Sequence, residues 1–189
     1  MARKIVLMMS ISLDGYIEGP DRSIEWHMVD EELHRYFNEK IAAMGGILSG
    51  RVTHELMAEF WPTADADPSS SPEMVEFAAI WRDIPKTVYS TTLERADWNT
   101  TVARRVDPDE VRALKDQPGE DLALGGADLA AAFMEHDLID AFHILVHPVL
   151  IGQGKPLFRS RDALTPLDLV GTRTFGNGVV LLHYERATR

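Results

Sequence analysis

Residues 121–158 read DLALGGADLAAAFMEHDLIDAFHILVHPVLIGQGKPLF and contain two apolar runs, 122–124 and 141–151, separated by two glycines and a helix-like segment. A short strand that is apolar throughout is typical of a parallel sheet buried on both faces. Gly125 and Gly126 come where this strand would turn into the helix, so a ligand can approach bare main chain and the first helical N–H groups. That position suits an anion such as a pyrophosphate. A turn that needs positive φ would explain the same glycines.

The rest of the chain alternates strand-like and helix-like segments. Strands are predicted at 4–13, 47–49, 86–90 and 101–106, and helices at 30–44, 50–60, 73–81 and 108–115. The final runs, 167–175 and 179–186, flank Gly176-Asn177-Gly178, which is a hairpin signal. We therefore expect one domain over 1–189, a three-layer α/β/α fold with a mostly parallel twisted sheet and a C-terminal antiparallel hairpin. The polar, proline-rich segment 62–72 is predicted to be a surface loop or flap.

Composition narrows the function classes. The chain has 189 residues, of which 45% are hydrophobic and 26% charged, as in ordinary globular proteins. Its formal net charge of −11 argues against nucleic-acid or anionic-membrane partners. The absence of cysteine excludes disulfides, thiolate metal sites and cysteine nucleophiles, and fits a reducing compartment such as the cytoplasm. No stretch is long enough for a membrane helix, and the apolar start is better explained by a first strand than by a signal peptide.

Three predicted strand ends carry small, hydroxyl or basic residues, at 49–53, 90–92 and 125–128. In parallel sheets ligands bind beyond the carboxyl ends of the strands. Arg51 offers a guanidinium suited to phosphate, and Thr53, Ser90 and Thr91 offer hydroxyls. Each segment alone is equally compatible with a helix cap or turn, but together they favour a dinucleotide. No G-x-G-x-x-G sequence is present, so a Rossmann reading fails.

Several motifs, in this order, resemble the reductase (C-terminal) domain of the bifunctional riboflavin-biosynthesis deaminase-reductase, and more closely its stand-alone relatives. They are SISLDGYI at 10–17, GRVT at 50–53, the strand end STTL at 90–93, GGADL at 125–129, LID at 138–140 and PVLIGQGKPLF at 148–158. These relatives share the dihydrofolate-reductase-like fold, and the resemblance covers nearly the whole chain. The fused zinc-dependent deaminase of the complete enzyme has no counterpart here.

The resemblance implies a reductase that binds NADPH along the carboxyl edge of the sheet. Gly50, Arg51 and Thr53 would hold the pyrophosphate and a neighbouring phosphate, and Ser90 and Thr91 would contact the 2′-phosphate. The segment after the strand at 122–124 would cradle the pyrophosphate and nicotinamide side through Gly125, Gly126, Ala127, Asp128 and Leu129. A cis peptide between the two glycines is a further expectation by resemblance. Asp128 is interpreted as a capping group that points away from the phosphates.

The substrate side is less well specified. Apolar walls for a planar heterocycle are expected from Trp26, Met28, Met57, Phe60 and Trp61, each of which could equally be ordinary core. Asp14 is either a substrate contact, as the resemblance suggests, or the aspartate of an Asp-Gly turn. The first helix has no isolated carboxylate in the middle of its apolar face, so a folate substrate is not expected. His143 and His147 lie too far apart on one strand to chelate a single ion, and no metal site is expected.

The sequence therefore predicts an NADPH-dependent reductase that transfers hydride to a C=N or C=O bond of a small planar heterocycle, without an assigned catalytic side chain. The alternatives are a pterin or small-carbonyl reductase of the same fold and a non-catalytic nucleotide-binding module. A homodimer is expected by resemblance, through the strand at 140–151 and the segment 152–158.

Overall fold

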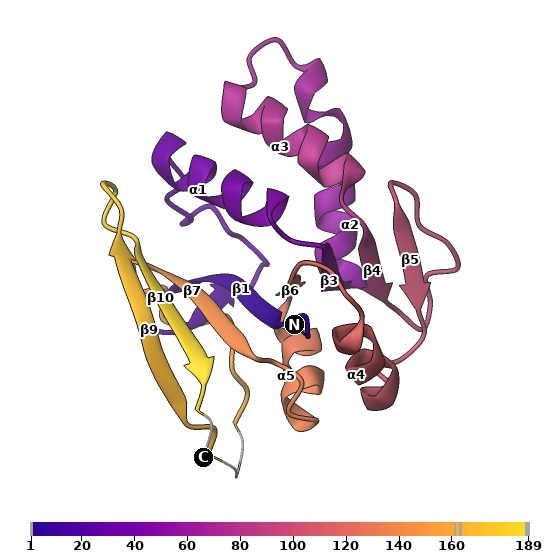
Figure 1. Cartoon of the computed structure of the whole chain (residues 1–189). Coiled ribbons are helices and arrows are strands. Elements are labelled where there is room, and N and C mark those ends of the chain that lie inside the picture. The colour runs from indigo at the N-terminus through magenta and orange to yellow at the C-terminus, as the bar shows by residue number, and fades with distance from the viewer. Residues whose placement is uncertain (1, 161, 163, 188–189) are drawn as a thin grey trace.

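The computed structural model describes residues 2–160, 162 and 164–187, and its centre is a twisted eight-stranded sheet (Figure 1). The strands run in the order β5 (Thr100–Ala103), β4 (Lys86–Tyr89), β3 (Gly46–Gly50), β6 (Leu122–Gly125), β1 (Ile5–Ser12), β7 (Ala141–His147), β10 (Val180–Arg186) and β9 (Leu167–Thr174). From β5 to β7 neighbouring strands are parallel, whereas β10 pairs antiparallel with both β7 and β9. A second, two-stranded sheet joins β2 (Tyr16–Glu18) to β8 (Lys155–Pro156). The mostly parallel sheet with its C-terminal hairpin confirms the predicted fold class.

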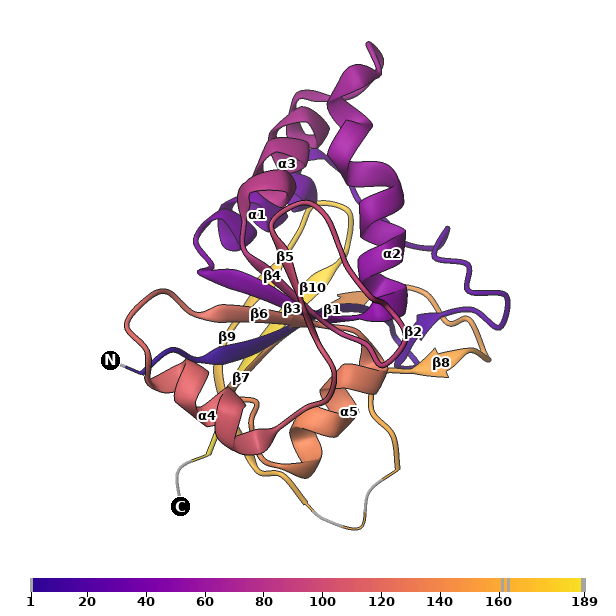
Figure 2. The same ribbon diagram turned by 90° about the vertical axis from the view of Figure 1, so that its right-hand side faces the viewer.

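Helices cover both faces of the sheet. α1 (Glu31–Ala42), α2 (Arg51–Phe60) and α3 (Pro72–Asp83) lie on one side, and α4 (Pro108–Asp116) and α5 (Ala127–Glu135) on the other (Figure 2). The two-residue period of β1 explains how both layers are held. Ile5 and Leu7 pack with α5, while Val6 and Met8 pack with α1 and α3, and all four are buried. β1 is therefore the central strand of two cores, as its uninterrupted apolar run predicts.

The segment 62–72 is not the irregular loop that its composition predicts. The 3₁₀-helix η1 (Trp61–Ala66) begins there, with Pro62 in its first turn and Pro62 and Ala64 buried, and α3 already begins at Pro72. Arg82 of α3 donates to the carbonyl of Pro62 and to Asp65, which fastens η1 to that helix. A proline early in a helix is favourable because its φ is already helical. None of the residues 62–72 lines the large groove described below, and a role of this segment as a flap stays a prediction.

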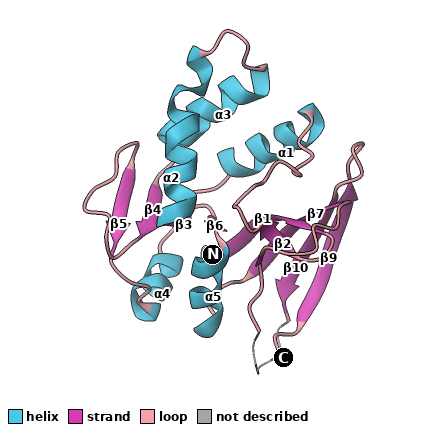
Figure 3. Cartoon of the chain, turned by 180° about the vertical axis from the view of Figure 1, so that it is seen from behind, coloured by secondary structure: helices cyan, strands magenta, loops and turns pink. Residues whose placement is uncertain are grey.

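The strand predicted at 140–151 is shorter in the structure, where β7 ends at His147 and Pro148 follows. Because β7 is paired with β1 on one edge and β10 on the other, it cannot be the edge that joins two copies. Two copies therefore cannot pair edge to edge along β7, and the interface through 140–151 and 152–158 stays a prediction. The edge strands of the sheet are β5 and β9. All residues of β9 except Gly171 are exposed, and Figure 3 shows β9 at the rim of the molecule, away from α4 and α5. Among the described residues, no helix is long and apolar enough to cross a membrane.

Candidate cofactor and substrate site

A groove of about 560 Å³ lies beyond the carboxyl ends of β3, β4 and β6. It brings together most of the predicted cofactor residues, namely Gly50, Arg51, Thr53, Ser90, Thr91, Gly126, Ala127, Asp128 and Leu129. The parallel pairing of β3 with both β4 and β6 puts these strand ends side by side. Gly125 does not line the groove but borders an adjoining apolar cavity. The strand-end argument from the sequence therefore locates a real concavity.

The two helices that begin at this groove lack side-chain caps. Asp30, Ser71 and Asp107 accept main-chain N–H bonds at the starts of α1, α3 and α4. In contrast, α2 begins at Gly50 and α5 at Gly126, and neither cap has a side-chain hydrogen bond. A helix start without a cap leaves N–H donors and the positive end of the dipole available to an anion. Two such starts face one groove, which favours a ligand with more than one phosphate.

Glycine is required by geometry at one of these starts. Gly126 has φ +95°, and a Cβ there would lie 2.9 Å from the hydroxyl oxygen of Thr53 on α2. The N–H of Gly126 meets the sulfur of Met9 at 3.2 Å. The Gly125–Gly126 peptide is trans, since none of the described peptide bonds is cis, and the cis expectation is wrong. Positive φ at the second glycine provides the sharp turn instead.

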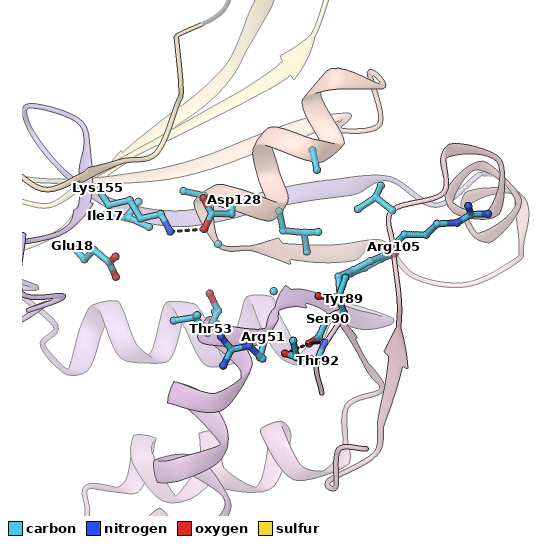
Figure 4. Close-up of a pocket in the computed structure, with 18 of the residues that line it drawn as sticks. Ile17, Glu18, Arg51, Thr53, Tyr89, Ser90, Thr92, Arg105, Asp128 and Lys155 are labelled. Carbon is cyan, nitrogen blue, oxygen red and sulfur yellow. Dashed lines mark hydrogen bonds and ion pairs between the residues drawn. The ribbon is translucent and has the colours of Figure 1, made fainter. Parts of the chain in front are cut away.

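The groove is locally basic although the chain carries a net charge of −11. Five cationic side chains line it against the carboxylates of Glu18 and Asp128; they are Arg22, Arg51, Arg104, Arg105 and Lys155. Figure 4 shows Lys155 and Asp128 on one side, Arg51 and Thr53 on the opposite side, and Arg105 extending beyond Tyr89. Such a concentration of positive charge suits a polyanionic ligand.

Sequence reasoning missed the two arginines that follow β5. Arg104 donates to the carbonyls of Ser90 and Leu93 and so shapes the loop after β4, while Arg105 pairs with Asp107. Within that loop the Ser90 hydroxyl accepts the N–H groups of Thr92 and Leu93. The signal was available, because a basic pair at the end of a strand obeys the same rule that selected Arg51. It was overlooked because β5 has little apolar character.

Asp128 does not point away from the groove, which corrects the expectation for this side chain. Its carboxylate pairs with Lys155, 2.6 Å away, and with Arg159. The hydrogen bond from Lys155 lowers the pKa of Asp128, and burial opposes this shift. Asp128 lies in the first turn of α5 but makes no cap bond. The two cations neutralise it, so it does not repel an anion at this helix start.

An apolar cavity of about 200 Å³ lies beneath α1, α2 and α3 and shares Thr53 with the groove. Its walls are mostly thioether, aromatic and aliphatic, from Met8, Met9, Phe37, Ile41, Ile47, Met57, Phe77, Trp81, Ala123 and Leu124. Its polar side chains are Ser49, Thr53, His54 and Lys86. None of the described residues that line it carries a carboxylate.

Lys86 is a buried cation at one end of this cavity. Its ammonium donates to the carbonyls of Trp81 and Ile84 and lies 4.4 Å from the centre of the Trp81 ring. Burial lowers the pKa of Lys86 to about 8. The neighbouring His54 is also buried, and burial, followed by the charge of Lys86, lowers its pKa.

Of the predicted substrate residues, only Met57 lines this cavity. Asp14 lies in the Asp-Gly turn after β1. Its carboxylate accepts the N–H groups of Ile151 and Gly152 and so fastens the loop that follows β7. Trp26 packs on His27 and His147, and Trp61 on Phe77. Met28 is exposed, and Phe60 lies 5.0 Å from Trp61, ring centre to ring centre. Tertiary packing thus explains four of these side chains without a ligand.

The histidines form pairs rather than a metal centre. His147 stacks on His27, with ring centres 5.1 Å apart, and His143 meets His183 at 4.2 Å. Within the described part of the chain, no group of three or more histidine, aspartate or glutamate side chains has a geometry that could hold a metal ion.

A family model described as the RibD C-terminal domain matches residues 3–181, nearly the whole chain. The protein belongs to the RibD C-terminal domain family. The chain is similar to the uncharacterized protein YyaP of Bacillus subtilis. The two are 33% identical over 187 residues, which cover 97% of this chain and 95% of YyaP. The family membership confirms the resemblance carried by the sequence motifs.

Solved structures agree with the RibD C-terminal assignment at the level of the fold. A putative riboflavin biosynthesis protein from Shewanella sp. PV-4 superposes with a TM-score of 0.71 and 22% identity, covering 100% of both chains. Dihydrofolate reductase from Enterococcus faecalis, solved in complex with NADP(H), gives a TM-score of 0.64 and 16% identity, again covering 100% of both. The fold is therefore dihydrofolate-reductase-like.

Proposed function

We propose that this protein is an NADPH-dependent reductase that transfers hydride to a C=N or C=O bond of a small planar compound. The observation that carries the proposal is the pair of uncapped helix starts, at Gly50 and Gly126, on one basic groove. Support comes from the dihydrofolate reductase of the same fold that was solved with NADP(H). Support also comes from membership of a reductase-domain family.

In this proposal the chain binds the phosphates from opposite walls. The N–H groups at the start of α5 take the pyrophosphate, with Lys155 beside them, and the start of α2 together with Arg51 takes the 2′-phosphate. Ser90, Thr91 and the two arginines after β5 surround the 2′-phosphate end. Thr53, at the border of groove and cavity, lies where the nicotinamide and the substrate would meet.

The bound cofactor would supply the hydride, and the protein would align the two rings and provide an apolar environment for the substrate. The cavity next to Thr53 is walled by apolar side chains that keep water from the enclosed part of the substrate, while its end at Thr53 adjoins the groove, from which solvent can reach the reacting atoms. Because no described residue lining it carries a carboxylate, the proton is assigned to solvent. Catalysis then depends on holding two rings face to face rather than on a strong side-chain acid.

Calorimetry with NADPH, followed by NADPH oxidation over a panel of pyrimidine, pterin and small carbonyl compounds, tests the proposal. We expect NADPH to bind and at least one class to be reduced. Reduction of a pterin would favour the alternative of a pterin reductase. Tight NADPH binding without oxidation on any compound would favour a non-catalytic nucleotide-binding module. No heat with either nicotinamide nucleotide would overturn the assignment.

A further inference from the structure

The apolar cavity restricts what this chain can reduce more tightly than the fold does. A cavity of roughly 150 Å³ lined by apolar side chains holds a benzene ring. The present cavity, of about 200 Å³, therefore has room for one aromatic ring with small substituents. A ribosylated pyrimidine or a pterin with its side chain would have to extend out of it.

The chemistry of the walls excludes charged and highly polar ligands. Sulfur and aromatic carbon from Met8, Met57, Phe77 and Trp81 dominate the lining. No guanidinium lines the cavity among the described residues, and the single ammonium, on Lys86, is already bonded to two main-chain carbonyls. A phosphate would thus be buried without adequate partners, and so would most edge atoms of a pyrimidine or pterin.

The polar groups lie at two ends of the cavity. Thr53 lines both the cavity and the groove. Ser49 pairs in register with Gly125, whose Cβ position lies 4.0 Å from the Thr53 side chain, so Ser49 lies at the same end of the cavity as Thr53. His54 and Lys86 gather around Trp81, with the His54 and Trp81 ring centres 6.0 Å apart. A ligand that satisfies both ends has an apolar middle and one oxygen at each end.

We propose that the cavity is the substrate site and that it selects a compact, uncharged aromatic aldehyde or ketone, with a hydroxyl opposite the carbonyl as the best-fitting form. Phosphorylated pyrimidines and pterins are excluded. This inference rests on the proposed function, because the reductant is the bound dihydronicotinamide. Hydride adds to the carbonyl carbon, the C=O π bond breaks, the oxygen takes a proton from solvent, and the cofactor leaves oxidised.

The test uses para-hydroxybenzaldehyde as the probe and two matched tryptophan variants of α2. Met57→Trp fills the cavity, whereas Leu56→Trp places the same side chain at a neighbouring exposed position. Binding is followed by saturation-transfer NMR with and without NADPH, and turnover by the absorbance of the reduced nicotinamide. We expect Met57→Trp to lower the affinity for para-hydroxybenzaldehyde by about ten-fold or more while the affinity for NADPH stays within about two-fold. Leu56→Trp should change neither affinity.

A second pair of measurements examines the Lys86 end. Lys86→Met should lower the affinity for para-hydroxybenzaldehyde by about ten-fold. The affinity for benzaldehyde, which lacks the hydroxyl, should fall by less than about two-fold. Thermal melting checks that the variant folds, and His54→Phe carries the same comparison if it does not. Equal losses for both aldehydes would remove the deep hydroxyl contact from the proposal.

Three outcomes would overturn the inference. They are an equal effect of the two tryptophan variants, no binding of the aldehyde to the NADPH-loaded protein, and reduction of a phosphoribosylated aminopyrimidine in preference to it. Failure of the proposed function would look different. NADPH would then not bind at all, while the aldehyde could still give an NMR signal in the cofactor-free protein that Met57→Trp abolishes.

Discussion

Gly126 is the residue at which main-chain geometry and the cofactor groove meet. Its φ of +95° disfavours any other residue, and a Cβ would press on Thr53 at 2.9 Å. We expect Gly126→Ala to destabilise the fold by about 1–3 kcal/mol, the usual cost of a side chain in such a conformation, and to weaken NADPH binding. Denaturant unfolding and calorimetry measure the two effects.

Gly152→Ala is the matched control for this substitution. Gly152 also has positive φ, at +76°, but nothing lies within 4 Å of its Cβ position, and it does not line the groove. The control should show the backbone strain alone, with NADPH affinity unchanged. Equal NADPH affinity in the two variants would show that the start of α5 is not a cofactor contact.

Arg51 tests the choice between the two nicotinamide nucleotides. In the structure its guanidinium pairs with Glu55, one turn along α2, at 2.7 Å, and both side chains are largely exposed. Exposed helix pairs of this kind contribute little, so a phosphate can take over the guanidinium. Arg51→Ala should lower the affinity for NADPH by about ten-fold more than the affinity for NADH, as expected for the loss of a charge-assisted bond to phosphate.

Arg112→Ala, in the exposed Arg112–Asp109 pair of α4, is the control for charge removal as such. It should leave both affinities unchanged. Should Arg51→Ala reduce NADPH and NADH binding equally, Arg51 does not contact the 2′-phosphate, and Arg104 and Arg105 become the next candidates.

At the scale of elements, the capped start of α1 allows a quantitative prediction. Asp30 accepts the N–H of Leu33 at 2.9 Å, and Leu33 is fully buried. Asp30→Ala should lower the free energy of unfolding by about 1 kcal/mol, as is usual for loss of an N-cap. Glu39→Ala, on the exposed side of the same helix, should change it by less than about 0.5 kcal/mol. Urea denaturation monitored by circular dichroism measures both, and equal effects would contradict the cap's role.

Local pattern predicted the strands and helices well because the signals were local. The apolar run of β1, the Asp30 cap and the Asn177-Gly178 turn each specify one element, and the structure confirms all three. Residues 62–66 were assigned wrongly because their order comes from Arg82, twenty residues further along the chain. Proline and aspartate in this segment are typical of a loop, but here the Arg82 guanidinium bonds to the carbonyl of Pro62 and to Asp65.

The candidate site was predictable where one chain segment suffices. The position at the end of a predicted strand identifies Gly50, Arg51 and Gly126 in the sequence, and in the structure all three line one groove. The cavity was not predictable in the same way, because it assembles Met57, Trp81 and Lys86 from different elements. Trp26, Trp61 and Asp14 contact other parts of the protein. The sequence alone does not reveal whether the partner of a bulky or charged side chain is a ligand or the protein itself.

For the whole molecule, two partly buried histidines contribute to the response to acid. Burial, aided by the charge of His147, lowers the pKa of His27 to about 4, and burial with the charge of His183 lowers that of His143 to about 4. Because the ordinary value is 6.5, the unfolded chain binds more protons within that window. Stability should therefore be greatest above pH 6.5 and fall as the pH drops toward 4.

Melting temperatures recorded across that window test this prediction. His27→Phe should reduce the dependence on pH, since the phenyl ring keeps the stack on His147 without a proton to gain. His136→Phe, at the exposed end of α5, is the control and should leave the slope of the wild type unchanged. A wild-type melting temperature that does not change over this range would contradict the prediction.

The association state is also a property of the whole molecule. β9 ends the sheet, and Leu169 and Val170 on it are more than half exposed. An unpaired, apolar edge strand invites pairing with a second chain. We expect a homodimer across β9, and Leu169→Lys combined with Val170→Lys should yield a monomer by light scattering. Val75→Lys, an exposed apolar position on α3, should remain dimeric. A monomeric wild type at micromolar concentrations would contradict the prediction.

The order of the sheet has a practical consequence for these measurements. The groove proposed for the nucleotide lies around β3, β4 and β6, whereas β9 closes the opposite end of the sheet. The sequence contains no thiol at all, so a single cysteine introduced at Thr172 on β9 would be its sole attachment point for a fluorophore or spin label. Self-association could then be followed by an optical or magnetic reporter while nucleotide titrations proceed undisturbed at the far end of the same molecule.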